Sequence, residues 1–337
     1  MNLKEDNLLE IRDLKVSFPL RRGLLKALRG VSYTMKKGEI LGLVGESGSG
    51  KSVSVQALMR LLPNYTQLEG EILFEGSDVG SLEKKKELPR FRAEKAAMIF
   101  QEPGRSFDPL YTMEKTFQET LTLHYPGESE DQLRQRAVSL MKEVQIPQPE
   151  DRLGSFPHQF SGGQLQRVMI ALALAGNPRL LIADEPTTAL DVTIQAQIIE
   201  LLLHLRENRG MGIIFISHDL DLVARIADRI FVLYGGLVME EAMARDLHTR
   251  ARHPYSRGLL HARPSFGTHY SRDTLHTIPG SVPDPVRPEP GCPFAPRCSH
   301  VQEDCLKEVP PLVSEAEGSQ YRCLFPMDPQ TDKRGTP

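Results

Sequence analysis

The chain has 337 residues, of which 40% are hydrophobic and 25% are charged, and its formal net charge is −3. This composition is ordinary for a globular protein, and the lack of a general basic charge argues against nucleic-acid binding. The longest apolar run near the middle, Val168 to Ala175, is too short to cross a bilayer, and the N-terminus lacks a signal-peptide core, so we expect a cytosolic protein in which disulfides are unfavourable.

Residues 8–44 alternate apolar and polar side chains, with turn residues at 21–23 and 36–38. A period of two predicts β-strands, and residues 71–74 continue the pattern. We therefore predict a patch of antiparallel strands in the N-terminal part of the chain.

A glycine-rich loop follows the apolar run 40–44, which predicts a buried strand, and precedes residues 53–62, which predict a helix. The loop reads Gly45-Glu46-Ser47-Gly48-Ser49-Gly50-Lys51-Ser52. Between a strand and a helix, this pattern binds phosphates, because the glycines let backbone N–H groups point inward and the helix adds its positive N-terminal dipole. Lys51 is expected to bridge the β- and γ-phosphates, and Ser52 to ligate Mg²⁺.

We therefore predict that the chain binds a nucleoside triphosphate. Phe18, in the β-patch before the loop, is a candidate to stack on the adenine base. The alternative for Phe18 is a half-buried strand residue with no contact to the nucleotide.

Residues 98–101 predict a short apolar strand that ends in Gln101, and a proline- and glycine-rich loop follows. Residues 113–145 and 161–175 then have helical patterns, interrupted by several prolines and glycines. We predict a helical insertion, at about residues 102–175, between two halves of an α/β core.

The α/β pattern returns after residue 176. Apolar strands are predicted at 180–183, 213–216 and 230–233, with an amphipathic helix at 193–208 between the first two. Strands that alternate with helices and carry polar residues at their ends indicate a parallel sheet with its site at the carboxyl edge.

Polar residues at these strand ends are candidates for catalysis. Asp184 is expected to anchor Mg²⁺ through the water shell of the metal, and Glu185 to act as general base for an attacking water. His218 follows the next strand and can reach the γ-phosphate or the water. Gln101 can ligate Mg²⁺ and report the state of the γ-phosphate to the helical insertion.

A second candidate anion site begins the helix at 161–175, with the residues Ser161-Gly162-Gly163-Gln164. These residues resemble the signature motif of the ATP-binding cassette (ABC) ATPases. The other motifs match that family in order: Walker A at the glycine-rich loop, Gln101 as the Q-loop residue, Asp184 and Glu185 after Walker B, the D-loop Thr188-Ala189-Leu190-Asp191, and His218 as the switch histidine.

The resemblance covers about residues 8–260. It implies an α/β P-loop NTPase core with an antiparallel β subdomain and a helical subdomain. It also implies that two cassettes close head to tail on ATP, so that Ser161–Gln164 of one chain cap the γ-phosphate held by the other. Hydrolysis by Glu185 and His218 would reopen the pair, and the helical insertion would couple this cycle to a membrane partner beside Gln101.

Further segments narrow the resemblance to the ATPases of peptide and nickel importers. They are Gln101–Pro103 with Ser106–Pro109, in which Asp108 replaces the usual Asn, then His253–Ser256, Ile278–Gly280 and the Cys-Pro-Phe-x-x-Arg-Cys stretch at 292–298. The resemblance implies a peripheral subunit at the cytoplasmic face of the inner membrane that powers import of short peptides. Its partners would be a second ABC ATPase subunit, either a second copy or a paralogue, two permeases and an extracytoplasmic binding protein.

Two alternatives remain open at this point. Nickel or metallophore importers share these motifs. A soluble ABC ATPase of DNA repair or translation is a different class, but such proteins usually carry long coiled-coil or tandem-cassette insertions, which this chain lacks.

After the predicted cassette at 1–260, residues 261–337 form a proline-rich extension that contains all four cysteines: Cys292, Cys298, Cys305 and Cys323. Four cysteines in a short cytosolic unit favour a metal site in place of a core. The tight cysteine knuckle typical of structural zinc is absent, and four thiolates also suit a [4Fe–4S] cluster. We rank a cluster first, zinc second and scattered reduced cysteines third. The resemblance supports this order, because some importer ATPases hold such a cluster in this extension.

Overall fold

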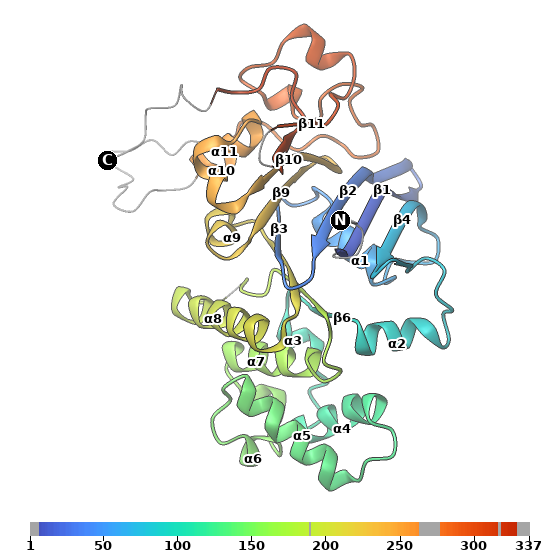
Figure 1. Cartoon of the computed structure of the whole chain (residues 1–337), viewed down its shortest axis with the longest axis vertical. Helices are drawn as coiled ribbons and strands as arrows, with labels where there is room; N and C mark the ends of the chain where they lie inside the picture. Colours follow the sequence, from blue (N-terminus) through green and yellow to red (C-terminus); the bar gives the residue numbers. More distant parts are fainter. Residues whose placement is uncertain (1–6, 189, 263–276, 316–317, 329–337) are drawn as a thin grey trace, which may run out of the picture. The chain divides into compact units, whose positions relative to one another are not determined.

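The computed structural model describes residues 7–188, 190–262, 277–315 and 318–328 (Figure 1). The described residues divide into two compact units. The first lies within Met1–Met35, Ile40–Gly80 and Ile216–Pro337, and the second within Lys36–Glu39 and Ser81–Phe215.

The first unit contains the predicted antiparallel patch. Its sheet has the order β2-β1-β4-β5, with bounds Asn7–Leu20 for β1, Gly23–Lys36 for β2, Gln67–Phe74 for β4 and Ser77–Asp78 for β5. Strands β1 and β4 run antiparallel, with Ile11 opposite Ile72, and both of these side chains are buried. The alternation in the sequence therefore does mark one buried face of a sheet, as predicted.

The first unit also holds the strand that leads into the glycine-rich loop, β3 (Ile40–Val44). It pairs in parallel with β9 (Arg229–Tyr234), which pairs antiparallel with β10 (Leu237–Met243). Two short strands, β12 (Gln320–Tyr321) and β11 (Val313–Ser314), continue beyond β10. The sequence pattern predicted no strand after 230–233, but the Gly235-Gly236 turn leads directly into the further buried strand β10.

Helices α1 (Lys51–Leu58), α9 (Leu220–Ile226), α10 (Ala244–Arg250) and α11 (Pro254–His261) belong to the same unit. Figure 1 shows α9, α10 and α11 beside β9 and β10. Gly42 explains how α9 lies so close to β3, because a Cβ atom at this position would be 2.2 Å from Val223 Cγ1.

The second unit has the strand order β8-β7-β6, with bounds Ala96–Ile99 for β6, Leu180–Asp184 for β7 and Gly212–Ser217 for β8, whose last two residues are counted with the first unit. Strands β6 and β7 are parallel. All residues of β7 and β8 are buried, which explains why both read as continuous apolar runs.

The predicted helical insertion is present in the second unit. Its helices are α3 (Pro103–Ser106), α4 (Met113–His124), α5 (Glu130–Glu143), α6 (Pro149–Arg152) and α7 (Gly162–Ala173), and α2 (Glu87–Glu94) and α8 (Val192–Arg209) flank it. Helix α4 ends at His124, just before Pro126-Gly127, and α5 ends at Glu143, four residues before Pro147. Two ion-pair contacts of 2.7 and 2.6 Å join Arg209 of α8 to the Glu143 carboxylate of α5.

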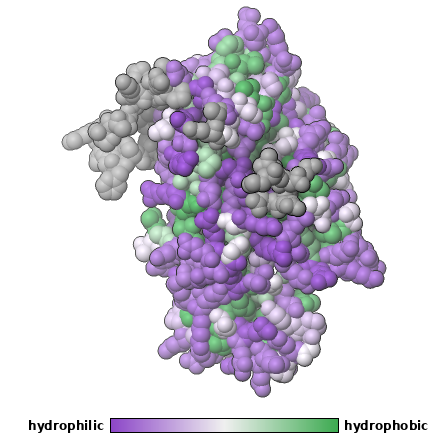
Figure 2. Space-filling view, in the orientation of Figure 1, coloured by the Kyte–Doolittle hydropathy of each residue, from purple (hydrophilic) through white to green (hydrophobic). Residues whose placement is uncertain are grey.

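The described part of the C-terminal segment, from residue 277 onward, is mostly irregular. Its prolines leave only the short 3₁₀ turns Ala295–Arg297 and Glu303–Leu306 together with the strands β11 and β12. Among the helices that the structure describes, none is long and apolar enough to cross a membrane. The face in Figure 2 is mostly hydrophilic, with scattered hydrophobic areas.

Candidate nucleotide-binding and catalytic site

The glycine-rich loop between β3 and α1 has a backbone that only glycine adopts readily. Gly45, Gly48 and Gly50 have φ angles of 154°, 79° and 106°, a range that disfavours residues with a Cβ atom. A Cβ atom at Gly45 would also lie 2.2 Å from the Leu233 carbonyl oxygen, whereas one at Gly48 would have no described atom within 4 Å. The loop therefore packs closely against the Leu233 carbonyl group at Gly45 and is loosely packed at Gly48.

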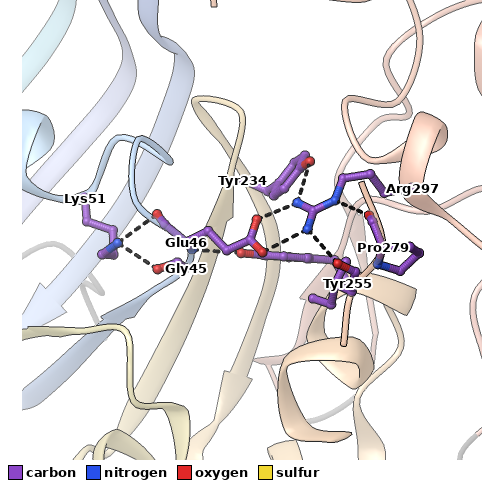
Figure 3. Close-up of polar contacts among 8 residues, drawn as sticks. Gly45, Glu46, Lys51, Tyr234, Tyr255, Pro279 and Arg297 are labelled. Carbon is purple, nitrogen blue, oxygen red and sulfur yellow. Dashed lines mark hydrogen bonds and ion pairs between the residues drawn. The ribbon is translucent and has the colours of Figure 1, made fainter. Parts of the chain in front are cut away.

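The Lys51 side chain turns back over this loop. Its Nζ donates to the carbonyl oxygens of Gly45 and Glu46 at 2.7 and 3.0 Å (Figure 3). Helix α1 begins at Lys51 with no side-chain cap among the described residues, and the buried Ser49 hydroxyl has no partner in the part of the chain that the structure describes. A buried ammonium group and an uncapped helix N-terminus at one loop fit an anion.

The second unit brings Gln101 and Glu185 together. Gln101 follows β6 and donates from Nε2 to Glu185 Oε2 at 2.8 Å, and the Thr188 hydroxyl donates to the same oxygen at 2.9 Å. Glu185 has a left-handed backbone, with φ of 47°, and follows the buried carboxylate of Asp184 at the end of β7. The residues predicted as general base and Q-loop glutamine are therefore in direct contact.

Ser161 is the N-cap residue of α7 and forms a capping box. Its hydroxyl accepts from the Gln164 N–H at 3.3 Å, and the Gln164 side chain accepts from the Ser161 N–H at 3.1 Å. Ser161 and Gly162 are exposed, whereas Gly163 is buried. The signature residues thus present a helix N-terminus at the surface of the second unit.

Gly163 packs against α8, and this contact gives a stability prediction. A Cβ atom at Gly163 would lie 2.6 Å from Ile194 Cγ2, while at Gly162 the nearest described atom would be 3.6 Å away. We expect Gly163→Ala to lower the free energy of unfolding by about 1–3 kcal/mol, as overpacking does. Gly162→Ala is the matched control and is expected to change it by less than about 1 kcal/mol. Urea unfolding of both variants measures the difference, and equal effects would contradict the close contact.

The remaining predicted site residues occupy strand ends and caps. Asp191 N-caps α8 by accepting from the Ile194 N–H at 2.9 Å, while Ala189 of the same D-loop lies outside the described residues. His218 is exposed after β8, and Phe18 is half-buried on β1. The glycine-rich loop, Phe18 and His218 lie in the first unit, whereas Gln101, Asp184, Glu185 and Ser161 lie in the second.

The four cysteines converge. Cys292, Cys298, Cys305 and Cys323 all line one cavity. Burial raises the pKa of three of these thiols, and that of Cys323 reaches about 11. Among the described residues, however, no group of three or more His, Cys, Asp or Glu side chains is close enough to hold a metal ion.

Sequence reasoning did not assign roles to Tyr255 and Arg297, which both contact the glycine-rich loop. The Tyr255 hydroxyl accepts from the Glu46 N–H at 2.9 Å, and Arg297 forms an ion pair with the Glu46 carboxylate. His253 caps α11 by accepting from the Tyr255 N–H, and burial lowers its pKa to about 3. Tyr255 and Arg297 lie in the segments 253–256 and 292–298, which stand out in the sequence for their family resemblance. The spacing of residues in these segments does not reveal that they contact the glycine-rich loop.

Comparisons with known proteins agree with these motifs. Residues 28–188 match the family described as ABC transporter, and residues 239–305 match the C-terminal region of the oligopeptide/dipeptide transporter family. The chain is 44% identical to a putative peptide import ATP-binding protein of Brucella melitensis over 324 residues, or 96% of each chain. It is also 44% identical to the oligopeptide transport protein OppD of Bacillus subtilis, covering 98% of this chain and 92% of OppD. The same identity relates it to the dipeptide transport protein DppD of Escherichia coli, covering 95% and 97% of the two chains.

The chain belongs to the oligopeptide/dipeptide transporter family of ABC ATPases.

Solved structures of ABC cassettes share the fold of this ABC ATPase. A dimeric ATP-binding cassette in a post-hydrolysis state, bound to ADP and Pi, aligns with a TM-score of 0.63 and 32% identity, covering 70% of this chain and 99% of that one. The cassette cbiO1 of Clostridium perfringens aligns with a TM-score of 0.60 and 28% identity, covering 72% and 91%. The P-loop NTPase fold class and the ATPase activity expected from the sequence are thereby confirmed.

Proposed function

We propose that this ABC ATPase hydrolyses ATP to power the import of short peptides. The observation that carries the substrate class is the similarity over nearly the whole chain, C-terminal region included, to proteins named for peptide import, oligopeptide transport and dipeptide transport. The observation that carries the catalytic assignment is the contact between Gln101 and Glu185.

In this proposal the glycine-rich loop, Gly45 to Ser52, holds the triphosphate. Lys51 exchanges its two carbonyl partners for the β- and γ-phosphates, because an anion is a stronger partner for an ammonium group than a neutral carbonyl. The hydroxyl of Ser52 and the carboxylate of Asp184 are oxygen donors of the type that Mg²⁺ prefers, and Gln101 offers an amide oxygen. When bound, Mg²⁺ neutralises charge on the phosphates.

Glu185 acts as general base in the proposed reaction. Its carboxylate accepts a proton from the attacking water while the water oxygen bonds to the γ-phosphorus and the bond to the bridging oxygen of ADP breaks. The left-handed backbone at Glu185 and its two hydrogen-bond donors, Gln101 and Thr188, hold the carboxylate in place. His218 is proposed to contact the γ-phosphate from its own strand end, and Phe18 to stack on adenine.

The signature residues are proposed to act in trans. Ser161 and Gly162 are exposed at the start of α7, and their helix N-terminus would cap the γ-phosphate bound by a second ABC subunit. Asp191, which begins α8, belongs to the same proposed interface.

Membrane permeases are the proposed coupling partners, together with an extracytoplasmic binding protein. The segment after β6 exposes apolar side chains at Phe100, Leu110 and Tyr111, with Leu110 81% exposed. Exposed apolar groups in one segment are typical of a protein-binding surface. Their position on both sides of Gln101 in the sequence supports permease docking next to the catalytic residues, and hence a peripheral location at the cytoplasmic face of the inner membrane.

Reconstitution tests the substrate class. The complex of both ABC subunits, the permeases and the binding protein is placed in proteoliposomes, and ATP hydrolysis is measured with dipeptides, longer peptides or Ni²⁺ as substrate. We expect stimulation by peptides. Stimulation by Ni²⁺ alone would support the nickel-importer alternative. Recovery of the chain with ribosomes or DNA, and not with permeases, would support the soluble class.

The four cysteines are proposed to bind a [4Fe–4S] cluster, with zinc as the alternative. A single ion requires sulfur atoms about 2.3 Å from its centre, and among the described residues no group of three or more His, Cys, Asp or Glu side chains could hold a metal ion. In a cluster each thiolate binds a different iron, so the four sulfurs lie farther apart around one space. Four thiols that line one cavity fit that arrangement.

Metal analysis tests this site. We expect about four irons and about four acid-labile sulfides per chain after anaerobic purification, and loss of both in Cys305→Ser. A content of one zinc ion per chain would support the zinc alternative and contradict the cluster. Absence of both metals would contradict the proposed metal site and leave the ATPase assignment intact.

A further inference from the structure

Arg297 places a fully engaged guanidinium group next to the glycine-rich loop (Figure 3). Its Nη1 and Nη2 donate to Glu46 Oε2 and Oε1 at 2.5 and 3.0 Å, which makes a bidentate ion pair. Nη1 also donates to the Tyr234 hydroxyl at 3.1 Å, and Nε and Nη2 donate to the carbonyl oxygens of Pro279 and Ile278. Arg297 thus joins the C-terminal segment to Glu46 of the loop.

The pair lies in an aromatic environment. The rings of Tyr234, Tyr255 and Phe294 contact one another, with centroids 4.6 to 5.4 Å apart. The Arg297 side chain is 5% exposed and that of Glu46 is 27% exposed. A bidentate ion pair with little access to water interacts more strongly than one at the surface. The hydrogen bond to Glu46 raises the pKa of Arg297.

Two residues outside the C-terminal segment also contact the loop: Tyr255 of α11 and Gly236 of the turn between β9 and β10. The Tyr255 hydroxyl accepts from the Glu46 N–H, and the Glu46 carbonyl accepts from Lys51 Nζ. The Gly236 N–H donates to the Ser49 carbonyl, and Pro293 packs on the adjacent Gly235, where an added Cβ atom would be 3.0 Å from Pro293 Cβ. Side chains outside the phosphate motif therefore fix both the backbone and the carboxylate of Glu46.

The charge of Glu46 presents a difficulty for a phosphate site. An acidic side chain in a loop that binds a triphosphate repels the ligand unless a cation neutralises it. Arg297 supplies that cation, and its planar, bidentate contact also turns the carboxylate toward the C-terminal segment.

We propose that Arg297 is a positioning residue for ATP binding: it neutralises Glu46 and holds the glycine-rich loop in shape. The C-terminal segment thereby sets the affinity of the loop for nucleotide. This inference rests on the proposed role of the loop in binding ATP and is independent of the peptide substrate and of any metal at the cysteines.

Calorimetric titration of ATP into the full chain tests the proposal. We expect Arg297→Gln to raise the Kd for ATP about tenfold, because Glu46 is left uncompensated. Neutralising the carboxylate as well, in the double variant Glu46→Gln/Arg297→Gln, should bring the Kd to within about threefold of Glu46→Gln alone. Arg287→Gln, which removes an exposed arginine of the same segment, is the matched control and should not change the Kd.

Salt distinguishes charge neutralisation from packing. Raising the ionic strength from about 0.01 M to about 1 M shortens the screening length from about 30 to about 3 Å, so the loss in Arg297→Gln should shrink. A wild-type Kd in Arg297→Gln, or a double variant as weak as Arg297→Gln, would overturn the proposal. If Arg297→Gln does not fold, the comparison of Glu46→Gln with the double variant still decides, because a loss much above threefold would contradict neutralisation. Lys51→Ala binding ATP like the wild type would instead refute the proposed role of the loop.

Discussion

Glu185→Gln is expected to lower the ATPase turnover number about a hundredfold or more while ATP still binds. An amide cannot accept the proton of the attacking water, and loss of a general base typically costs a factor of about 10²–10⁴. The amide oxygen of the variant can still accept from Gln101 and Thr188, whose hydrogen bonds hold the carboxylate in the wild type, so the local structure should persist. Turnover and the Kd for ATP are measured on the same preparation.

The control for this variant is Glu200→Gln, which makes the same chemical change at an exposed position of α8. It should hydrolyse ATP like the wild type. Because hydrolysis reopens the dimer in the proposed cycle, Glu185→Gln should also accumulate as a dimer with ATP in size-exclusion chromatography. Near-normal turnover in Glu185→Gln would remove this residue as the base.

Ser161→Arg is expected to lower the ATPase turnover number about a hundredfold without weakening ATP binding to the same chain. The exposed start of α7 is proposed to cap the γ-phosphate of a partner subunit, and removing one preorganised donor at such a site costs about 10²–10³ in rate. The arginine would also occupy the space into which the nucleotide must fit. Steady-state ATPase assays of the assembled dimer and ATP binding to the isolated chain measure the two effects separately.

Ser129→Arg is a closely matched control. Ser129 begins α5 with the same capping box as Ser161, in which Gln132 takes the place of Gln164. Both variants lose a helix cap, at a cost of about 1 kcal/mol of stability, but only Ser161 belongs to the signature. Equal losses of turnover in both would show a folding defect, and loss of ATP binding in the isolated Ser161→Arg chain would contradict capping in trans.

Much of the fold could be predicted because local sequence and tertiary environment agree. The apolar runs of β3, β7 and β8 are continuous because those strands are buried on both faces, and the alternation in β1 reflects one buried face. Strand β10 escaped prediction because Glu240 and Glu241 interrupt its apolar pattern. Both glutamates are buried, and Glu240 accepts from the Arg252 and His253 N–H groups. These hydrogen bonds come from residues 252–253, so a single-strand pattern does not contain them.

In the candidate site, too, some contacts could be predicted from the sequence and others could not. Gln101 and Glu185 follow two strands that pair in parallel, so their proximity follows from the sheet rule. Arg297 is 251 residues from Glu46, and an irregular proline-rich segment carries it there. No periodicity encodes such a contact, because its geometry depends on carbonyl and aromatic groups from several distant elements.

The contact between Arg297 and Glu46 also affects whether the cassette can be separated from the C-terminal segment. A chain shortened at residue 260 would keep every ATPase motif yet lose the only described guanidinium partner of Glu46, along with Phe294, which packs against Tyr234 and Tyr255. The two buried rings of Tyr234 and Tyr255 would become exposed to water, and the partly exposed Glu46 carboxylate would become more so. On the proposed role of Arg297, the smallest chain with full nucleotide affinity is longer than the ATPase motifs indicate, and we expect a fragment that ends at the last motif to bind ATP more weakly than the whole chain.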